Sequence, residues 1–239
     1  MNPTLFIVIG ATLLVSFGLI FNGFVLLPRQ MDRAYHEAYL ALALAVEAKE
    51  TASKGHCERV TELVCRMAAL AHLPRKQATI LEHAALLHDI GKAAVHANIL
   101  NKAEALTPEE EAEMAKHSEY GVQMLSATNK HLSKLGYTNE MIRQTEDLAM
   151  TQYQMLRHIA EIIRCHHTPL SEMPDMTMEA RLLAVADTYD RMVTGRSYLE
   201  PRSVFESIKY LEDRSPAVYD PEAVRLLRQV LDQRRASAH

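Results

Sequence analysis

The stretch HAALLHDIGK, residues 83–92, does most to decide the fold of this chain. Its apolar residues follow helical spacing up to Leu87, and a histidine, an aspartate and a glycine come soon after them. A glycine just past the last periodic residues is typical of a helix end. His88 and Asp89 are therefore predicted to lie beside each other at the C-terminal end of an apolar helix.

The segments on both sides of this stretch repeat their apolar residues at the same helical spacing. Thr107 before Pro108, with acidic residues at 109–111, is a typical helix start, because it combines a cap, a proline at the first position and negative charge in the first turn. No run with the alternation of a strand stands out, so the sequence predicts an all-α protein. The helices are expected over 57–72, 76–90, 108–126, 176–193 and 201–214. The polar segment 127–155 fits either a long loop or an additional helical hairpin.

The composition excludes several classes of protein. The chain has 239 residues, of which 48% are hydrophobic and 23% charged, and these values fit one substantial globular domain rather than a disordered chain. The net charge of −4 and the lack of a long basic run argue against a nucleic-acid polymer as partner. The three cysteines, Cys57, Cys65 and Cys165, match no zinc-clip spacing and are expected to be reduced thiols. The unusual feature of the composition is its twelve histidines.

Residues 5–27 form an apolar run without a charged side chain. As one helix they would measure roughly 35 Å, against a hydrocarbon core of about 30 Å. Pro3 and Pro28 bracket the run, which argues against a buried core helix, and the lack of a basic start and of a small-residue cleavage site argues against a cleaved signal peptide. We therefore expect an N-terminal transmembrane helix. Arg29 and Arg33, just beyond it, predict that the C-terminal bulk lies in the cytoplasm.

The segment after this run is rich in alanine and leucine. Residues 30–53 are predicted to form one helix that leads from the anchor into the rest of the chain. A homodimer through the anchor and this helix is one expected assembly, although no strict heptad repeat supports it.

Further histidines and aspartates stand apart from the helical pattern. His56 follows Gly55 at the start of a helix, and Asp187 lies in the apolar run RLLAVAD, where an unpaired carboxylate would be costly to bury. Each such residue, taken alone, can also be a surface or capping residue. Together they offer a mixture of nitrogen and oxygen ligands that suits Fe, Mn or Zn. The set predicts a site for two metal ions, made by His56, His88, Asp89, His117, His166, His167 and Asp187.

The order of these motifs resembles the HD-GYP branch of the HD phosphohydrolase superfamily. The matching motifs are GH at 55–56, HDIGK at 88–92, H-x-E-x-G at 117–121, HH at 166–167 and AVAD at 184–187. The resemblance implies an HD-domain helical bundle. The expected domains are then a membrane anchor at 1–28, a connecting helix at 29–53, the HD-GYP-like domain at 45–225 and a C-terminal tail at 226–239.

The resemblance also implies two, sometimes three, Fe or Mn ions held by the predicted ligands, with Asp89 bridging two of them. Lys92 and Arg196 match residues that contact substrate phosphate, and the alternative that both are solvated surface bases stays open. Because residues 52–55 carry no carboxylate, two ions are expected rather than three. The family reaction is hydrolysis of cyclic di-GMP, which two metal ions assist by activating water and by neutralising charge on the phosphate.

The chain departs from the family pattern in the segment after the paired histidines. Thr168 replaces a glutamate, no GYP triplet occurs, and Leu199 and Glu200 stand where a second basic residue is expected. The predicted function is still a membrane-anchored phosphodiesterase for cyclic di-GMP or a related cyclic dinucleotide, at the inner membrane of a bacterium. Two alternatives stay open: hydrolysis of another nucleotide or phosphate ester, and a non-catalytic scaffold that recruits signalling partners at the membrane.

Overall fold

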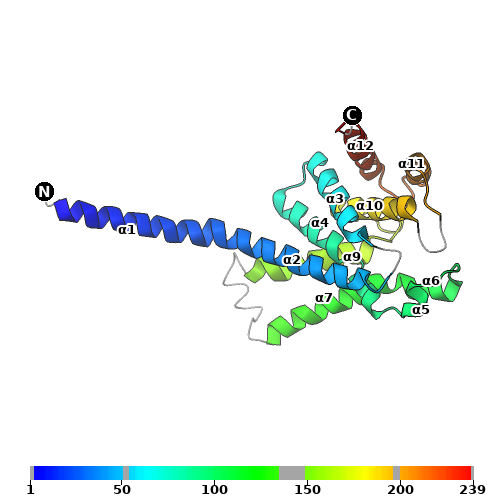
Figure 1. Ribbon diagram of the computed structural model, residues 1–239, viewed down its shortest axis with the longest axis horizontal. Coiled ribbons are helices and arrows are strands. Elements are labelled where there is room, and N and C mark those ends of the chain that lie inside the picture. The colour runs from blue at the N-terminus through cyan, green and yellow to red at the C-terminus, as the bar shows by residue number, and fades with distance from the viewer. Residues whose placement is uncertain (1–2, 51–53, 135–148, 196–199, 238–239) are drawn as a thin grey trace. The chain divides into compact units, whose positions relative to one another are not determined.

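The computed structural model describes residues 3–50, 54–134, 149–195 and 200–237, and every regular element in these ranges is helical (Figure 1). The all-α prediction is confirmed. By its internal contacts the chain divides into two compact units, Met1–Ala41 and Leu42–His239. The residues predicted to bind metal all belong to the second unit.

The first unit consists of α1 (Pro3–Phe21), a π-helical turn η1 (Asn22–Leu26) and the larger part of α2 (Leu27–Glu47). The predicted transmembrane helix and the single-pass inner-membrane location are wrong, because no helix in the described part of the chain is both long and apolar enough to cross a bilayer. The apolar run 5–27 is not one α-helix: it is divided among α1, the π-helical turn and the first residue of α2. From Arg29 onward α2 carries charged side chains, so it does not prolong the apolar run.

The second unit is a helical bundle that follows the last residues of α2. Its elements are α3 (His56–Leu70), α4 (Arg75–Leu87), the 3-10 turn η2 (Ile90–Ala94), α5 (Ala97–Leu100), α6 (Pro108–Ala115), α7 (His117–Lys134), α9 (Ala149–Cys165), α10 (Met178–Thr194), α11 (Val204–Asp213) and α12 (Pro221–Ser237).

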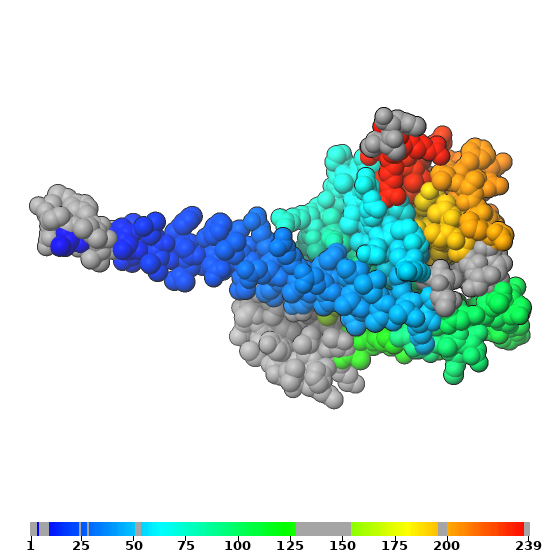
Figure 2. All heavy atoms as spheres, viewed as in Figure 1, coloured from blue at the N-terminus to red at the C-terminus, as the bar shows by residue number. Residues whose placement is uncertain are grey.

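Four helices, α3, α4, α9 and α10, pack against one another at the centre of this bundle (Figure 1). Their shared core is aliphatic, and Leu63, Leu81, Ile159 and Leu182 are among its fully buried side chains. Burying a side chain of this size contributes roughly 1.5–3 kcal/mol to folding. Around the centre, α7 packs on α9 and η2. On another side, α11 and α12 pack on α10, as the orange, red and yellow atoms in Figure 2 show. The predicted ligands lie on these same helices and at their ends, so the packing of the core determines how far apart they are.

The connecting helix ends earlier than the sequence predicts. It was expected over 30–53, but α2 stops at Glu47. The Glu47 carboxylate accepts hydrogen bonds from the backbone N–H groups of Gly55 (2.9 Å) and Cys57 (2.6 Å), so it caps the start of α3. Gly55 has a φ of 71°, a conformation that favours glycine, and this allows the chain to turn into α3.

The helix predicted over 108–126 is two helices, because the chain breaks at Lys116 between α6 and α7. The predicted start at Thr107 is confirmed: its hydroxyl accepts a hydrogen bond from the Glu110 N–H, and the Glu110 carboxylate accepts one from the Thr107 N–H. The break makes His117 the first residue of α7, and this position brings its ring to the site described below.

Two less regular segments of the sequence contain helical residues in the described part of the chain. Within 127–155, α7 continues to Lys134 and α9 begins at Ala149, while residues 135–148 lie outside the described part of the chain. Residues 226–237, where a C-terminal tail was expected, belong to α12. Leu226 and Leu227 in this helix are buried, because they face the core between α10 and α3.

Candidate metal centre

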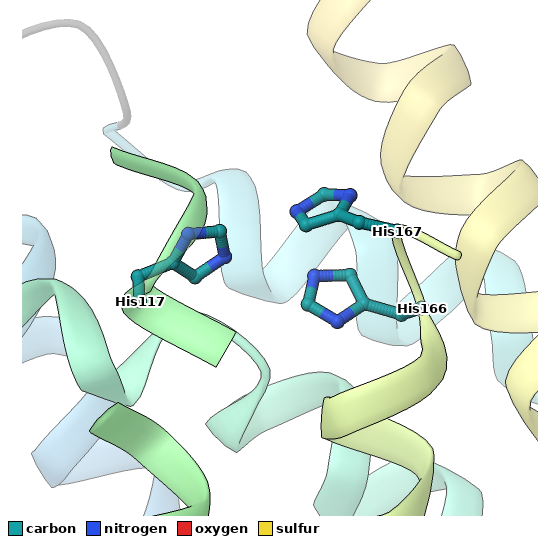
Figure 3. Close-up of side chains that lie close together, drawn as sticks. All are labelled: His117, His166 and His167. Carbon is teal, nitrogen blue, oxygen red and sulfur yellow. The ribbon is translucent and has the colours of Figure 1, made fainter. Parts of the chain in front are cut away.

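The seven predicted ligands meet at one place in the second unit. His56 begins α3, His88 and Asp89 follow α4, and Asp187 lies within α10, while the other three histidines come from the start of α7 and the end of α9. Their potential ligand atoms form three groups, in each of which all atoms lie within 4.8 Å of one another. The groups are His117, His166 and His167 (Figure 3); His56, His88 and Asp187; and His88, Asp89 and His166.

The backbone determines which ring nitrogen of three histidines faces the cluster. Each Nδ1 lies against a carbonyl oxygen one turn earlier: His88 on Ala85 (2.7 Å), His117 on Met114 (2.7 Å) and His166 on Ile163 (2.6 Å). Because a carbonyl oxygen can only accept, each Nδ1 must carry the proton, and this leaves the lone pair of each neutral ring on Nε2. In Figure 3 the rings of His117 and His166 turn toward each other and toward His167. This tautomer is the one that a metal ligand needs.

Two carboxylates lie among these imidazoles. Asp187 Oδ1 is 3.1 Å from His56 Nε2 and 3.5 Å from His88 Nε2. Asp89 reaches both sides of the cluster, with Oδ2 3.4 Å from His88 Nε2 and Oδ1 3.3 Å from His117 Nε2. An aspartate in this position can supply one oxygen to each of two ions.

Unsatisfied polar atoms show that these residues fit a metal ion. His117 Nε2, His166 Nε2 and Asp187 Oδ2 are buried and make no hydrogen bond of good geometry within the described part of the chain, whereas the buried Asp187 Oδ1 has Arg191 Nε as an ion-pair partner at 2.7 Å. Leaving such atoms without a partner costs about 1–3 kcal/mol each, and more for charged groups. Atoms of this kind that converge on one point are the donor set that a divalent transition metal prefers.

The charges in the cluster favour the protonation states of metal ligands. Burial alone would raise the pKa of Asp89, but His88, Lys92 and Arg191 together hold it well below its usual range, so the carboxylate is ionised. Burial, assisted by His88, lowers the pKa of His166 to about 3, so this ring stays neutral. Burial would also lower the pKa of His88, but the neighbouring Asp89 and Asp187 raise it instead. Metal binding is therefore expected to release a proton from His88.

Comparison with known sequences assigns the chain to a family. The sequence model described as "HD domain" matches residues 41–223. The chain belongs to the HD domain family. This confirms the resemblance on which the sequence analysis relied, and the matched residues include every predicted ligand.

Two curated relatives of this HD domain are named as phosphodiesterases. The 3'3'-cGAMP-specific phosphodiesterase 2 of Vibrio cholerae is 29% identical over 192 residues, covering 80% of this chain and 34% of the relative. The cyclic di-GMP phosphodiesterase of Thermotoga maritima is 30% identical over 183 residues, covering 77% and 46%. The chain thus spans less than half the length of either relative.

A solved structure supports the fold of the HD domain. Bd1817, an HDG"Y"P protein from Bdellovibrio bacteriovorus, superposes with a TM-score of 0.54 at 20% sequence identity, and the match covers 84% of this chain and 64% of Bd1817. At this identity the likeness concerns the fold alone.

His56 is held in place by Asp190 and Arg59, two residues that were not predicted from the sequence. Asp190 Oδ2 accepts a hydrogen bond from His56 Nδ1 at 2.8 Å, and this leaves His56 Nε2 to face the cluster. Arg59 donates two hydrogen bonds to the same carboxylate, from Nε to Oδ1 at 2.8 Å and from Nη2 to Oδ2 at 2.9 Å. Asp190 follows Asp187 by three residues on α10, a spacing that places both on one helix face and could have identified it.

We expect Asp190→Asn to weaken metal binding by about ten- to a hundredfold, because a carboxylate behind a ligating histidine fixes its orientation and raises its basicity. Titration calorimetry with Mn²⁺ measures the effect, and the melting temperature checks that the fold is retained. Asp213→Asn, on an exposed side chain of α11, is the matched control. Equal Mn²⁺ affinity in the two variants would contradict a role for Asp190 in positioning His56.

Lys92 of the HDIGK motif is not a solvated surface base. Its side chain is buried, and Nζ lies 2.7 Å from Glu50 Oε2 and 2.9 Å from Asp89 Oδ2. Glu50 was not predicted. Its carboxylate is a second anionic partner of the Lys92 ammonium group, besides Asp89. Arg196, the other predicted phosphate contact, lies outside the described residues.

A cavity of about 280 Å³ opens beside the cluster. His167 and Asp187 form its inner wall, so the cavity lies next to the predicted ligands. Its lining is His167, Asp187, Thr188, Arg191, Met192, Glu200, Arg202 and Tyr210. Two arginines in this lining supply positive charge in a chain whose net charge is −4.

Proposed function

We propose that this HD domain is a metal-dependent phosphodiesterase that hydrolyses cyclic di-GMP or a related cyclic dinucleotide. The observation that carries the proposal is the cluster of imidazoles and ionised carboxylates, whose buried nitrogen and oxygen atoms converge beside a cavity lined by arginines. The names of the curated relatives, which are phosphodiesterases for cyclic dinucleotides, agree with this chemistry.

Two ions, Fe or Mn, are the proposed cofactors. His56, His88 and Asp187 would hold one, His117, His166 and His167 the other, with Asp89 between them. Such ions supply Lewis acidity that activates water and neutralises charge on a phosphate. The chain's own part is to fix the Nδ1 atoms of His56, His88, His117 and His166 by hydrogen bonds, and to keep both aspartates ionised in a buried site.

The cavity is the proposed position of the substrate. Arg191 and Arg202 line it and provide donors for phosphate oxygens. The Tyr210 ring also lines it and holds Arg202 nearby, with the guanidinium carbon 5.2 Å from the ring centroid. Arg196 stays a proposed phosphate contact, and Lys92 is proposed to act at the boundary between the ions and the phosphate.

A substrate panel tests the function. The protein, loaded with Fe²⁺ or Mn²⁺ without air, is incubated with cyclic di-GMP, 3'3'-cGAMP, a linear dinucleotide and a mononucleotide, and the products are separated by chromatography. We expect a linear dinucleotide from the cyclic substrates. Release of phosphate from the mononucleotide alone would instead favour the second candidate, a phosphohydrolase for another ester, which the missing GYP segment permits.

We expect Lys92→Ala to lower turnover by roughly a hundredfold while metal content falls far less. Bound ions can replace the positive charge that Lys92 gives to Asp89, but they cannot replace its contact with substrate phosphate. Elemental analysis and the hydrolysis assay on one sample measure both quantities, with the exposed Lys76→Ala as control. Equal loss of turnover and metal would exclude the phosphate contact.

A further inference from the structure

Arg191 reaches into the ligand cluster from α10. Its Nε lies 2.7 Å from Asp187 Oδ1, and its Nη2 lies 3.3 Å from Asp89 Oδ1. Its side chain is 20% exposed, because it also forms part of the cavity wall. One guanidinium therefore connects both predicted carboxylate ligands to the cavity.

The two oxygens that Arg191 contacts are the ones that face the imidazoles. Asp187 Oδ1 is 3.1 Å from His56 Nε2, and Asp89 Oδ1 is 3.3 Å from His117 Nε2. An ion beside His56 would compete for Asp187 Oδ1, and an ion beside His117 would compete for Asp89 Oδ1. The guanidinium thus provides positive charge where a divalent ion would provide it.

A guanidinium and a divalent ion cannot share these oxygens without cost. Both are cations, and in a buried site of low dielectric their repulsion at a few ångströms is strong. The two carboxylates, in turn, repel each other unless some cation lies between them. Without metal, Arg191 contacts both carboxylates and Lys92 adds a second contact to Asp89. Bound ions would supply the positive charge in place of Arg191.

The cavity offers the Arg191 side chain a second position, away from the two carboxylates. Arg191 follows Asp187 by one helical turn, and its side chain has several rotatable bonds at the border of the open space. Arg202 lines the same cavity, so an anion there would meet two guanidinium groups. Guanidinium binds phosphate oxygens through two parallel hydrogen bonds, which makes it well suited to this task.

We propose that Arg191 is both an internal competitor of the metal ions and a phosphate-binding residue. Without metal it pairs with Asp187 and Asp89; when ions take these oxygens, it turns into the cavity and binds the phosphate of the substrate. The phosphate part rests on the proposed function, whereas the competition with metal does not.

The proposal predicts effects of opposite sign from one substitution. Arg191→Met keeps the length of the side chain and removes its charge, so Mn²⁺ should bind at least about tenfold more tightly than to the unchanged protein. Inorganic phosphate, added to the Mn²⁺-loaded variant, should bind at least about tenfold more weakly. Titration calorimetry measures both, and Arg228→Met, on an exposed arginine of α12, should change neither.

Arg191→Gln serves as the second variant in case the methionine variant does not fold, because it keeps hydrogen-bond donors without the charge. Melting curves with and without Mn²⁺ show whether each variant is folded. Mn²⁺ affinity that is unchanged or weaker in the folded variants overturns the proposal, as does unchanged phosphate affinity. A residue that merely supports the fold would weaken both.

The proposed function can fail separately. If the Mn²⁺-loaded protein hydrolyses no cyclic dinucleotide but Arg191→Met tightens Mn²⁺ and weakens phosphate, the phosphodiesterase proposal fails and the role of Arg191 stands. If hydrolysis is observed and Arg191→Met leaves Mn²⁺ affinity unchanged, the role of Arg191 fails and the phosphodiesterase proposal stands.

Discussion

Asp89→Ala is expected to remove the bound metal and to lower phosphodiester hydrolysis by roughly a thousandfold or more, about 4 kcal/mol in activation free energy. The reason is position: Oδ2 lies 3.4 Å from His88 Nε2, and Oδ1 lies 3.3 Å from His117 Nε2, so one side chain serves both sides of the cluster. No other carboxylate of the predicted ligand set contacts both of these histidines. Elemental analysis of protein purified without air or chelator should find about two Fe or Mn per chain, lost in the variant.

The variant also leaves Lys92 and Arg191 with one anionic partner fewer, so its melting temperature must be measured beside its metal content. Asp213→Ala, on an exposed aspartate of α11, controls for the loss of a carboxylate elsewhere. A folded but metal-free parent protein would contradict the two-metal centre, and would turn attention to capture of a protein partner. Full activity of Asp89→Ala would equally contradict it.

Gly91→Ala is expected to lower the free energy of unfolding by about 3 kcal/mol or more. Gly91 lies in η2 directly against α7, and an added Cβ would stand 1.8 Å from the carbonyl oxygen of His117 and 2.5 Å from the backbone nitrogen of Gly121. Because these are backbone atoms, they can move only if the start of α7 moves. The displacement would carry His117 away from the cluster, so metal content should fall as well.

Gly121→Ala is the matched control for this substitution. A Cβ there would meet side-chain methyl carbons, Ile90 Cγ2 at 3.2 Å and Ile163 Cγ2 at 3.4 Å, and these can shift slightly. Alanine also gains up to about 1 kcal/mol over glycine inside a helix, so the expected change lies within about 1 kcal/mol of zero. Urea denaturation of both variants gives the comparison. Equal stability of the two would disprove the close approach of η2 to α7.

The seven candidate ligands could be selected from the sequence because their signals are local. His88 and Asp89 end an apolar helix, His117 follows the glutamate-rich segment, and Asp187 interrupts an apolar run. Each of these features can be recognised within fewer than about twenty neighbouring residues. The order of the motifs along the chain then identified the family. Helix class and the start at Thr107 follow from the same local rules of periodicity and capping.

Local rules also produced the errors. Hydropathy along 5–27 does not indicate where α1 gives way to a π-helical turn, and it therefore predicted a membrane span that the described helices do not contain. Periodicity over 108–126 likewise does not show the break at Lys116, which separates α6, a helix without buried residues, from α7, the helix that packs on α9 and η2. In each case one regular pattern in the sequence covers more than one element of the structure.

The all-helical class, most of the helices, the family and the candidate ligands could be inferred from the sequence, because those signals come from residues close together in the chain. Only the tertiary structure showed what surrounds the ligands. His56 is held by Asp190, 134 positions away, and Asp89 is contacted by Arg191, 102 positions away. Such pairs form only when the core has brought α3, α4 and α10 together. Burial then makes their charges interact strongly, because the surroundings have a low dielectric constant.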